Sequence, residues 1–529
     1  MPQGTGEKSA SEWTESRNPA TGELLGRTPV QSVEEVRDAV ARARKAQRDW
    51  GATPVSERAD RLLRVRSAIV TRADDLASAI SKDTGKTRVD ALATEVIPAA
   101  MAVAYYCRKA ETFLEDEPLG AGSLLFAYKR SKVVRVPWGV VGIISPWNYP
   151  FAIPFSEVIM ALLAGNAVVL KAATETQLVA RAFTECTAAA GLPEGLFTCV
   201  NLPGKVAGAA LLESGANKLF FTGSVAVGKT LMAKASETLT PLSLELGGND
   251  AMLVCEDADL ERAASGAVWA GMQNAGQSCG GVERIYVHEA VYEEFLCRLK
   301  RRVEALRVGP DLDFEVDVGA MTTGRQLGTV QRHVQDALSK GAVLYASSKA
   351  PEGSAGFFLP AMVLTEVNHG MLLMREETFG PVVGVMRVKD MEEAVALAND
   401  SNLGLTGSVW SRDSRKADAL ARRIQAGAVT INDHLMSHGL PETPWGGFKE
   451  SSLGRTHGAI GFAEMTQPQV IVGDVLPGVK RALWWHPHGR RVYEGLLGAL
   501  DLLYAESVVR RLRGLWRLLA LAPRMFRAG

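Results

Sequence analysis

The chain has 529 residues, of which 47% are hydrophobic, and its 59 basic and 59 acidic side chains give a formal net charge of zero. A chain of this length predicts roughly two to four domains and buries enough apolar surface to fold without disulfide bonds. The balanced charge argues against a field that recruits nucleic acid, so we expect no nucleic-acid partner.

The six cysteines are scattered along the chain. None belongs to a Cys-x-x-Cys pair, and none lies near a histidine at the spacing of zinc ligands, so we predict no metal site. Scattered cysteines in a large chain are typical of a reducing compartment, which favours the cytoplasm. The polar start of the chain does not resemble a signal peptide, and no uninterrupted apolar run of about 18 residues predicts a spanning helix.

The first long segment, residues 32–117, carries a helical pattern. Ser32 is a candidate N-cap, and Glu35 stands three residues later, at the spacing of a capping box. Apolar residues then recur at three- and four-residue intervals. Residues 124–136 follow as a predicted hairpin arm, with Leu124–Phe126 and Lys132–Val136 as its strands.

From residue 139 onwards, short apolar runs alternate with helical stretches. The runs cover residues 140–144, 167–170, 198–201 and 218–221, and a helical stretch covers 175–190. Buried parallel strands have this composition, and their alternation with helices predicts a doubly wound parallel sheet. The alternation resumes after residue 250, which indicates a second α/β domain.

The composition changes again after residue 477. The segment Tyr493–Phe526 carries leucines and Trp516 at helical spacing, with Arg510, Arg513 and Arg517 on another face. This pattern predicts a basic amphipathic segment that does not span a membrane. Two interpretations remain open: contact with a membrane surface, or packing on the protein's own dimer.

Two stretches with glycines are candidates for a cofactor site and a catalytic base. Phe221–Gly228 follows a predicted strand and opens a helix, a place where backbone N–H groups favour phosphate. It lacks the usual Gly-x-Gly-x-x-Gly spacing, so a plain strand-to-helix turn is the alternative. Glu245 stands in an apolar stretch before Gly247 and Gly248, where burial would raise the pKa of a general base. A surface glutamate before a turn is the alternative there.

Two further stretches are candidates for a nucleophile and an oxyanion donor. Cys279 lies among small residues in Asn274–Gly281, with room for a substrate carbonyl, and a thiolate is the natural nucleophile for an aldehyde. A small buried cysteine is the alternative. Asn148 stands at a strand end between two prolines, where its side-chain amide could be held rigidly toward an oxyanion; a proline-rich turn is the alternative.

The order of these four stretches resembles that of the aldehyde dehydrogenase superfamily, and so do Glu376–Pro381 and Pro444–Lys449. The resemblance covers about residues 15–470. It implies that Cys279 attacks the aldehyde, and that the Asn148 amide and the Cys279 N–H hold the oxyanion. It also implies that Glu245 activates the water that hydrolyses the thioester. Such a base favours release of a free acid over transfer to coenzyme A.

The same resemblance implies NAD or NADP as cofactor. Lys171 would lie at the adenosine ribose, Ser224 at the pyrophosphate, Glu377 at the nicotinamide ribose and Phe379 at the nicotinamide. The remaining residues that it assigns to the cofactor site are Trp147, Thr174, Gly223 and Gly228.

One departure from the family bears on cofactor choice. The family usually reads Lys-Pro-Ser/Ala-Glu where this chain reads Lys171-Ala172-Ala173-Thr174. That glutamate binds the ribose 2′-hydroxyl and repels a 2′-phosphate. Thr174 removes the charge, so NADP should be tolerated or preferred. Glu175, one residue further on, leaves the preference open.

The resemblance also implies the architecture, an α/β fold with a Rossmann-like cofactor domain at residues 1–119 and 137–246. An α/β catalytic domain would cover 247–455, an oligomerisation arm 120–136 and 456–476, and an amphipathic extension 477–529. The arm would pair across subunits in a homodimer or homotetramer, because an unpaired strand edge is a natural contact.

The extension resembles those of bacterial fatty-aldehyde-type dehydrogenases, so we expect a medium- or long-chain aliphatic aldehyde as substrate. The protein would be cytoplasmic and could lie peripherally on the inner face of the membrane. The alternative substrate is a semialdehyde or amino-aldehyde. A more remote alternative is a non-catalytic, membrane-associated protein on this scaffold.

Overall fold

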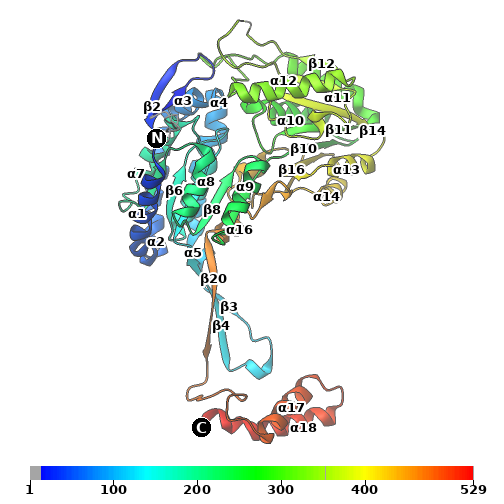
Figure 1. Cartoon of the computed structure of the whole chain (residues 1–529). Helices are drawn as coiled ribbons and strands as arrows, with labels where there is room; N and C mark the ends of the chain where they lie inside the picture. The colour runs from blue at the N-terminus through cyan, green and yellow to red at the C-terminus, as the bar shows by residue number, and fades with distance from the viewer. Residues whose placement is uncertain (1–12, 352, 528–529) are drawn as a thin grey trace, which may run out of the picture. The chain divides into compact units, whose positions relative to one another are not determined.

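The computed structural model describes residues 13–351 and 353–527 (Figure 1). The chain divides into two compact units. We call them the main unit, built from residues up to 113 and from 137–467, and the tail unit, built from 114–136 and from 468 onwards.

The main unit begins with a two-stranded antiparallel sheet and a series of helices. The predicted capping box of the first helix is confirmed: the Ser32 hydroxyl accepts from the Glu35 N–H at 3.1 Å, and the Glu35 carboxylate accepts from the Ser32 N–H at 2.7 Å. The elements of this segment are β1 (Trp13–Arg17), β2 (Leu24–Pro29), α1 (Val33–Ala52), α2 (Val55–Thr71), α3 (Ala73–Thr84), α4 (Arg88–Ala91), the π-turn η1 (Leu92–Val96) and α5 (Ile97–Leu114).

A six-stranded sheet follows, in the order β19-β9-β8-β5-β6-β7, parallel except for β19. From the central β5 the chain runs to β6 and β7 on one side and then to β8 and β9 on the other. The carboxyl end of β5 is therefore a topological switch point, where α/β proteins bind ligands. The elements are β5 (Val140–Ile144), α6 (Ala152–Leu163), β6 (Ala167–Lys171), α7 (Gln177–Ala188), β7 (Phe197–Val200), α8 (Gly204–Glu213), β8 (Lys218–Thr222), α9 (Val225–Ala235), β9 (Leu242–Glu245) and β19 (Ser452–Leu453).

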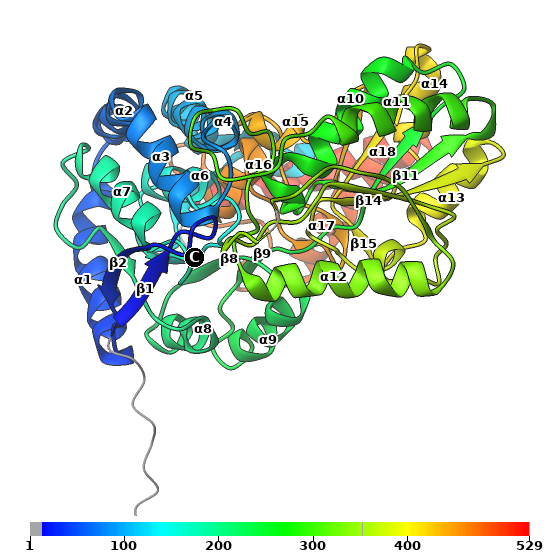
Figure 2. The same cartoon turned by 90° about the horizontal axis from the view of Figure 1, so that it is seen from above.

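A seven-stranded sheet confirms the second α/β region, in the order β12-β13-β14-β11-β10-β16-β17, parallel except for β12. Within the main unit, helices α1, α7 and α8 lie beside the first sheet, and helices α11, α13 and α14 lie beside the second (Figure 2). The elements are β10 (Asp250–Val254), α10 (Leu260–Met272), η3 (Gln273–Gly276), β11 (Val282–His288), η4 (Glu289–Val291), α11 (Tyr292–Glu304), α12 (Gly324–Ser339), β12 (Val343–Ser347), β13 (Met362–Thr365), η5 (Leu372–Met374), β14 (Val382–Val388), α13 (Met391–Asn399), β15 (Leu403–Gly404), β16 (Thr406–Trp410), α14 (Ser414–Ala421), β17 (Ala428–Ile431), α15 (Met436–Gly439), β18 (Phe448–Lys449) and α16 (Gly458–Glu464).

One helical stretch among the described residues, Arg88–Leu114, is long and apolar enough by length and composition to cross a bilayer. Of the 18-residue segment with the highest mean hydropathy in this stretch, 44% is buried inside the protein. Within it, the Tyr106 hydroxyl donates to the Pro441 carbonyl at 2.9 Å, and the Tyr106 ring is fully buried. These contacts pack one side of the stretch against the rest of the main unit.

The tail unit contains a three-stranded sheet in the order β20-β4-β3, built from β3 (Glu117–Leu119), β4 (Lys129–Pro137) and β20 (Thr466–Asp474). The hairpin is present, but Leu124–Phe126 is not one of its strands. These residues form a 3₁₀ turn, η2, because the Ser123 hydroxyl accepts from the Leu125 N–H and closes the backbone there. The partner of β4 is β3, with Glu117 opposite Val133.

The helical pattern of Tyr493–Phe526 folds as two helices, α17 (Arg490–Tyr504) and α18 (Val508–Leu521), followed by the 3₁₀ turn η6 (Ala522–Phe526). Extended backbone at Ala505 ends α17. The two helices pack closely through glycines: a Cβ on Gly514 would lie 2.5 Å from the Gly498 carbonyl oxygen. The packed side of the two helices contributes to a small core, which contains Leu483, Val492, Leu521 and Met525.

Candidate active site

Cys279 lies just before β11 and borders three cavities. The first, of about 660 Å³, is apolar. The second, of about 330 Å³, reaches Glu245 and Glu157. The third, of about 850 Å³, is a cleft at the carboxyl end of β5. A group at Cys279 could therefore be approached from three directions.

The cleft brings together most of the residues expected from the sequence. They come from the segments that follow β5, β8 and β9 and from those that precede β11 and β14. The Trp147 and Phe379 rings meet edge to face, with centroids 5.5 Å apart. The predicted residues that line the cleft are Trp147, Asn148, Gly223, Ser224, Glu245, Cys279, Glu377 and Phe379.

Two glycines after Glu245 let the walls of this cleft approach each other. A Cβ on Gly247 would lie 2.6 Å from the Glu377 carboxylate, and one on Gly248 would lie 2.3 Å from the Cys279 carbonyl oxygen. The Gly248 N–H also donates to Glu377 at 3.1 Å. Only glycine leaves room for these contacts, which explains why the stretch Glu-Leu-Gly-Gly needs both of them.

Three predicted cofactor residues lie outside the cleft lining. Lys171 ends β6 directly beside Ile144 of β5, so its buried side chain lies at the same carboxyl edge of the sheet. Thr174 follows three residues later and is half-buried. Gly228 lies one turn inside α9, where a Cβ would meet the Leu246 side chain at 2.8 Å. Gly228 therefore takes part in the packing of α9, whereas Ser224 is exposed at the start of this helix.

The Glu245 carboxylate is buried, and neither of its oxygens has a hydrogen-bond partner. Burial raises its pKa well above the usual value, the charge of Glu157 raises it further, and Arg455 opposes the shift. Glu157 is buried as well, and burial raises its pKa to about 8. A carboxyl group without hydrogen bonds and with a raised pKa can take up a proton near neutral pH.

The Cys279 thiol is held in its protonated form. Burial raises its pKa most, and the carboxylates of Glu377, Asp250 and Glu245 raise it further. A thiol in these surroundings needs a base to become a nucleophile. Glu245 borders both the small cavity and the cleft at Cys279.

Asn148 is buried, and its side-chain amide donates to the Gln277 carbonyl at 3.1 Å. The segment that holds Gln277 has left-handed backbone at Asn274 and Ala275, with φ of 52° and 53°. A Cβ on the adjacent Gly276 would lie 2.0 Å from the Gly380 carbonyl oxygen. This turn carries the chain past the Asn148 side chain to Cys279.

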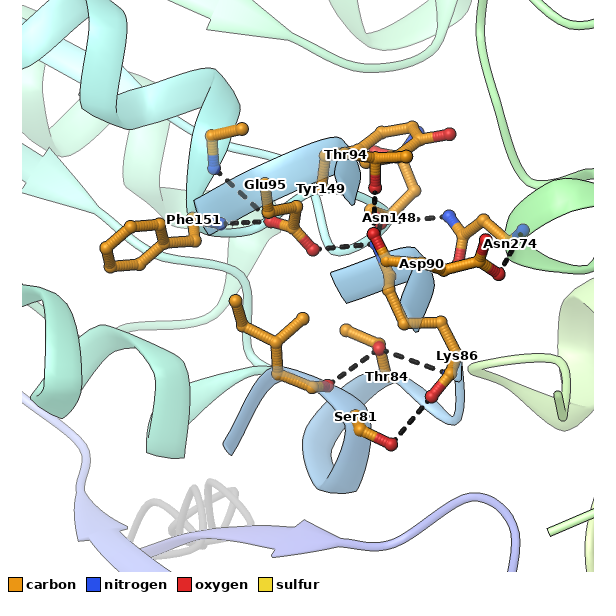
Figure 3. Close-up of polar contacts among 12 residues, drawn as sticks. Ser81, Thr84, Lys86, Asp90, Thr94, Glu95, Asn148, Tyr149, Phe151 and Asn274 are labelled. Carbon is orange, nitrogen blue, oxygen red and sulfur yellow. Dashed lines mark hydrogen bonds and ion pairs between the residues drawn. The ribbon is translucent and has the colours of Figure 1, made fainter. Parts of the chain in front are cut away.

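A buried ion pair supports the Asn148 backbone (Figure 3). The Lys86 ammonium group contacts the Glu95 carboxylate at 2.7 Å, and both side chains are fully buried. It also donates to the Asn148 carbonyl oxygen at 2.7 Å, and the Asn274 side chain donates to the same oxygen at 3.0 Å. The second Glu95 oxygen accepts from the Phe151 N–H at 2.7 Å. The loop after β5 is thus fixed from two sides.

Sequence reasoning missed Lys86, Glu95 and Glu157. Lys86 and Glu95 stand in a helical region with many other charges, and nothing local distinguishes them. Glu157 could have been recognised from the sequence, because it is the single charged residue in the otherwise uncharged helix α6, whose side chains are all buried. Outside this set, His333 contacts Thr378 and His369 contacts Asp400.

The first cavity beside Cys279 is lined by apolar and neutral polar side chains. None of its lining residues within the described chain is a lysine, arginine, aspartate or glutamate. The single histidine, His438, packs edge to face on Trp445 at 4.8 Å, and burial lowers its pKa to about 4, so it is neutral. The larger lining side chains are Tyr149, Ile153, Trp269, Leu435, Met436 and Trp445.

Comparisons with known proteins agree with this geometry. The model of the aldehyde dehydrogenase family matches residues 6–471. A 4,4'-diapolycopene aldehyde oxidase from a Methylomonas species is 38% identical over 490 residues, which cover 93% of this chain and 91% of the relative. A putative succinate-semialdehyde dehydrogenase [NADP(+)] from Mycolicibacterium smegmatis is 39% identical over 472 residues, covering 88% and 90%.

Solved structures are similar over nearly the same region. The Mycobacterium tuberculosis aldehyde dehydrogenase complexed with NAD+ has a TM-score of 0.83 and 34% identity, covering 89% of this chain and 96% of that one. An NADP-dependent enzyme of E. coli has a TM-score of 0.84 and 32% identity, covering 88% and 95%.

The chain therefore belongs to the aldehyde dehydrogenase family. The predicted fold, the enzyme class and the use of NAD or NADP are confirmed: the protein is an NAD(P)-dependent aldehyde dehydrogenase. The remote alternative of a non-catalytic protein finds no support. Helices α17 and α18 lie beyond the residues that the family model matches.

Proposed function

We propose that the enzyme oxidises a medium- or long-chain aliphatic aldehyde to the free carboxylic acid. The observation that carries this proposal is the cavity beside Cys279, whose described lining contains no charged side chain. An alkyl chain loses no hydrogen bonds on entering such a cavity and gains about 0.8 kcal/mol for each buried CH₂ group.

In the proposed first step, the Cys279 thiol loses its proton to a water molecule of the cleft, and its sulfur attacks the carbonyl carbon of the aldehyde. The carbonyl oxygen becomes an oxyanion, held by the Asn148 side-chain amide and the Cys279 backbone N–H. The Gln277 carbonyl and the Lys86 network support this role, because they fix the Asn148 side chain and backbone before the substrate arrives.

Bound NAD or NADP supplies the hydride acceptor. Loss of the hydride leaves a thioester between the substrate acyl group and the Cys279 sulfur. Glu245 then accepts a proton from a water molecule whose oxygen attacks the thioester carbon. The carbon–sulfur bond breaks, the free acid leaves and the Cys279 sulfur is regenerated.

The residues of the cleft fit a dinucleotide. The first backbone N–H groups of α9 have no acceptors within the helix, and they suit a pyrophosphate next to Ser224. The Glu377 carboxylate, Trp147 and Phe379 would hold the nicotinamide riboside, and Lys171 the adenosine ribose. Because Thr174 carries no negative charge, we propose that NADP is tolerated or preferred.

A semialdehyde dehydrogenase is the second candidate, and one relative carries that name. Its substrate has a second, negatively charged end. A carboxylate is held most strongly by a cationic partner, and among the described residues that line the cavity none is cationic. This observation favours the aliphatic aldehyde.

We also propose a homodimer or homotetramer of a cytoplasmic enzyme that contacts a membrane surface through its C-terminal segment. In the described part of the chain, β20 pairs with β4 on one side only. Its residues Val470, Ile471 and Val472 are exposed. A strand edge of this kind suits pairing with a second subunit.

The test is a steady-state series of straight-chain aldehydes and succinic semialdehyde, each with NAD and NADP. We expect kcat/KM to rise by up to about fourfold for each CH₂ group until the cavity is filled. The Cys279→Ala variant should be inactive with every substrate. A kcat/KM that is highest for succinic semialdehyde would replace this proposal with the second candidate.

A further inference from the structure

Helix α18 carries two apolar stripes in different surroundings. Gly514, Leu518 and Leu521 recur at helical spacing and face the inside of the tail unit. On the other side, Val508, Leu512, Trp516 and Leu519 form a second stripe, with exposed fractions of 68%, 56%, 74% and 53%. An amphipathic helix that buries one apolar stripe and exposes another is expected to bind a second partner through the exposed stripe.

Uncompensated positive charge flanks the exposed stripe. Arg511 and Arg513 lie on its two sides, and neither forms an ion pair with any described residue. Arg510 and Arg517 instead face α17, where they approach the Asp501 carboxylate at 2.6 and 3.9 Å. Residues 490–527 hold eight arginines against three acidic residues, although the whole chain is neutral.

We propose that the exposed stripe of α18 docks on the surface of an anionic lipid bilayer. Leu512, Trp516 and Leu519 enter the boundary between head groups and acyl chains, and Arg511 and Arg513 contact lipid phosphates. The inference builds on the proposed membrane contact of the C-terminal segment and specifies the face and the lipid charge.

The other apolar stripe of the tail unit fits a bilayer less well. Tyr493, Leu497, Leu500 and Tyr504 of α17 border a cavity shared with Leu125 and Phe126. Of the two arginines at the start of that helix, Arg490 is paired with Glu494 at 2.8 Å, and Arg491 falls by helical spacing on the side opposite to this stripe. Charge complementarity to anionic lipid is therefore concentrated on α18.

A second copy of the chain is also a poorer partner for the α18 stripe. In a symmetric contact, Arg511 and Arg513 of both copies would lose water at one interface. Helix α18 has no acidic residue that could pair with them there. Like charges that face each other across an interface cost several kcal/mol. An anionic membrane turns the same charges into attraction.

The experiment is sedimentation of the full-length enzyme with vesicles of phosphatidylcholine alone and of phosphatidylcholine mixed with phosphatidylglycerol. Trp516→Gln/Leu519→Gln removes apolar contact from α18, and Leu497→Gln/Leu500→Gln makes the matched change on α17. Arg511→Gln/Arg513→Gln removes the flanking charge. Arg64→Gln/Arg66→Gln is the charge-matched control, because both side chains are exposed in the main unit.

We expect the wild-type enzyme to bind the anionic vesicles and to be released by salt. The α18 apolar variant should bind roughly 100-fold more weakly and the α18 charge variant about 30-fold more weakly. The α17 variant and the charge control should bind as the wild type does. Absence of wild-type binding, or a loss confined to the α17 variant, would overturn the proposal.

Two further readouts keep the result unambiguous. Turnover of a short, soluble aldehyde reports folding and the proposed function, and it should be equal in all variants whether or not they bind vesicles. Light scattering without lipid reports the oligomeric state. If the α18 apolar variant lost its subunit contacts instead of its vesicle binding, the stripe would be an interface between copies and the proposal would be wrong.

Discussion

The Lys86 ammonium group donates a 2.7 Å hydrogen bond to the backbone carbonyl oxygen of Asn148, the proposed oxyanion donor. Lys86 is fully buried with its ion-pair partner Glu95 and lies 4.2 Å from the centroid of the Tyr149 ring. A buried charge fixed in this way holds the loop after β5 more firmly than neutral hydrogen bonds would. We therefore regard Lys86 as a positioning residue for Asn148.

Replacement of Lys86 by methionine should lower both stability and turnover. It leaves the Glu95 charge buried without a partner, which costs about 3–5 kcal/mol, and it frees the Asn148 loop. In Lys86→Met/Glu95→Gln the charge is gone and an amide oxygen still accepts from the Phe151 N–H, so Tm should recover. If kcat recovered together with Tm, Lys86 would have a purely structural role.

The charge of Glu157 should set the pH at which Glu245 works. A negative neighbour disfavours a second carboxylate, so Glu157 raises the pKa of Glu245. In Glu157→Gln that repulsion is absent, the pKa of Glu245 falls, and the acid limb of the kcat profile moves to lower pH. A limb that stays in place, or moves to higher pH, would show that Glu157 does not influence the base.

Cofactor choice should respond to residue 174. Thr174→Glu introduces a carboxylate that repels a 2′-phosphate, so KM for NADP should rise about tenfold or more, with KM for NAD unchanged or lower. Glu175→Gln is the matched control. A stronger effect of the control on KM for NADP would show that Glu175 is the residue that discriminates between the two cofactors.

Loss of the proposed base should separate the two half-reactions. In Glu245→Gln no carboxylate is available to activate water, so hydrolysis of the thioester should slow by a factor of about 10²–10⁴. Stopped-flow absorbance should then show a burst of up to one reduced nicotinamide per active site, followed by slow turnover. If acylation slows as strongly as hydrolysis, the burst disappears, and Glu245 is then required to deprotonate Cys279.

Much of the main unit could be predicted from the sequence, because its strands are short apolar runs with clear boundaries. The predicted runs at 140–144 and 218–221 correspond to β5 and β8, and the capping box at Ser32 formed as expected. Prediction was weaker where a local hydrogen bond outweighs the composition of a segment. Leu124–Phe126 has the composition of a strand, yet a local hydrogen bond from the Leu125 N–H to the Ser123 hydroxyl closes it into a turn.

The residues of the candidate site also differ in how far the sequence could predict them. Cys279, Glu245 and Asn148 stand in stretches whose glycines and prolines are visible in the sequence, and the structure brings all three to one cleft. Lys86 and Glu95 act on Asn148 from more than 50 positions away in the chain and have no local pattern. Gly228 looked like part of a phosphate turn, but its side of α9 faces Leu246.

The most direct test of the account is mass spectrometry of the Glu245→Gln variant after it has reacted with a long-chain aldehyde and NADP. The account predicts one acyl group per subunit, located on the peptide that contains Cys279 and removed by hydroxylamine. An unmodified Cys279 in protein that has produced reduced nicotinamide, or an acyl group on another residue, would contradict it.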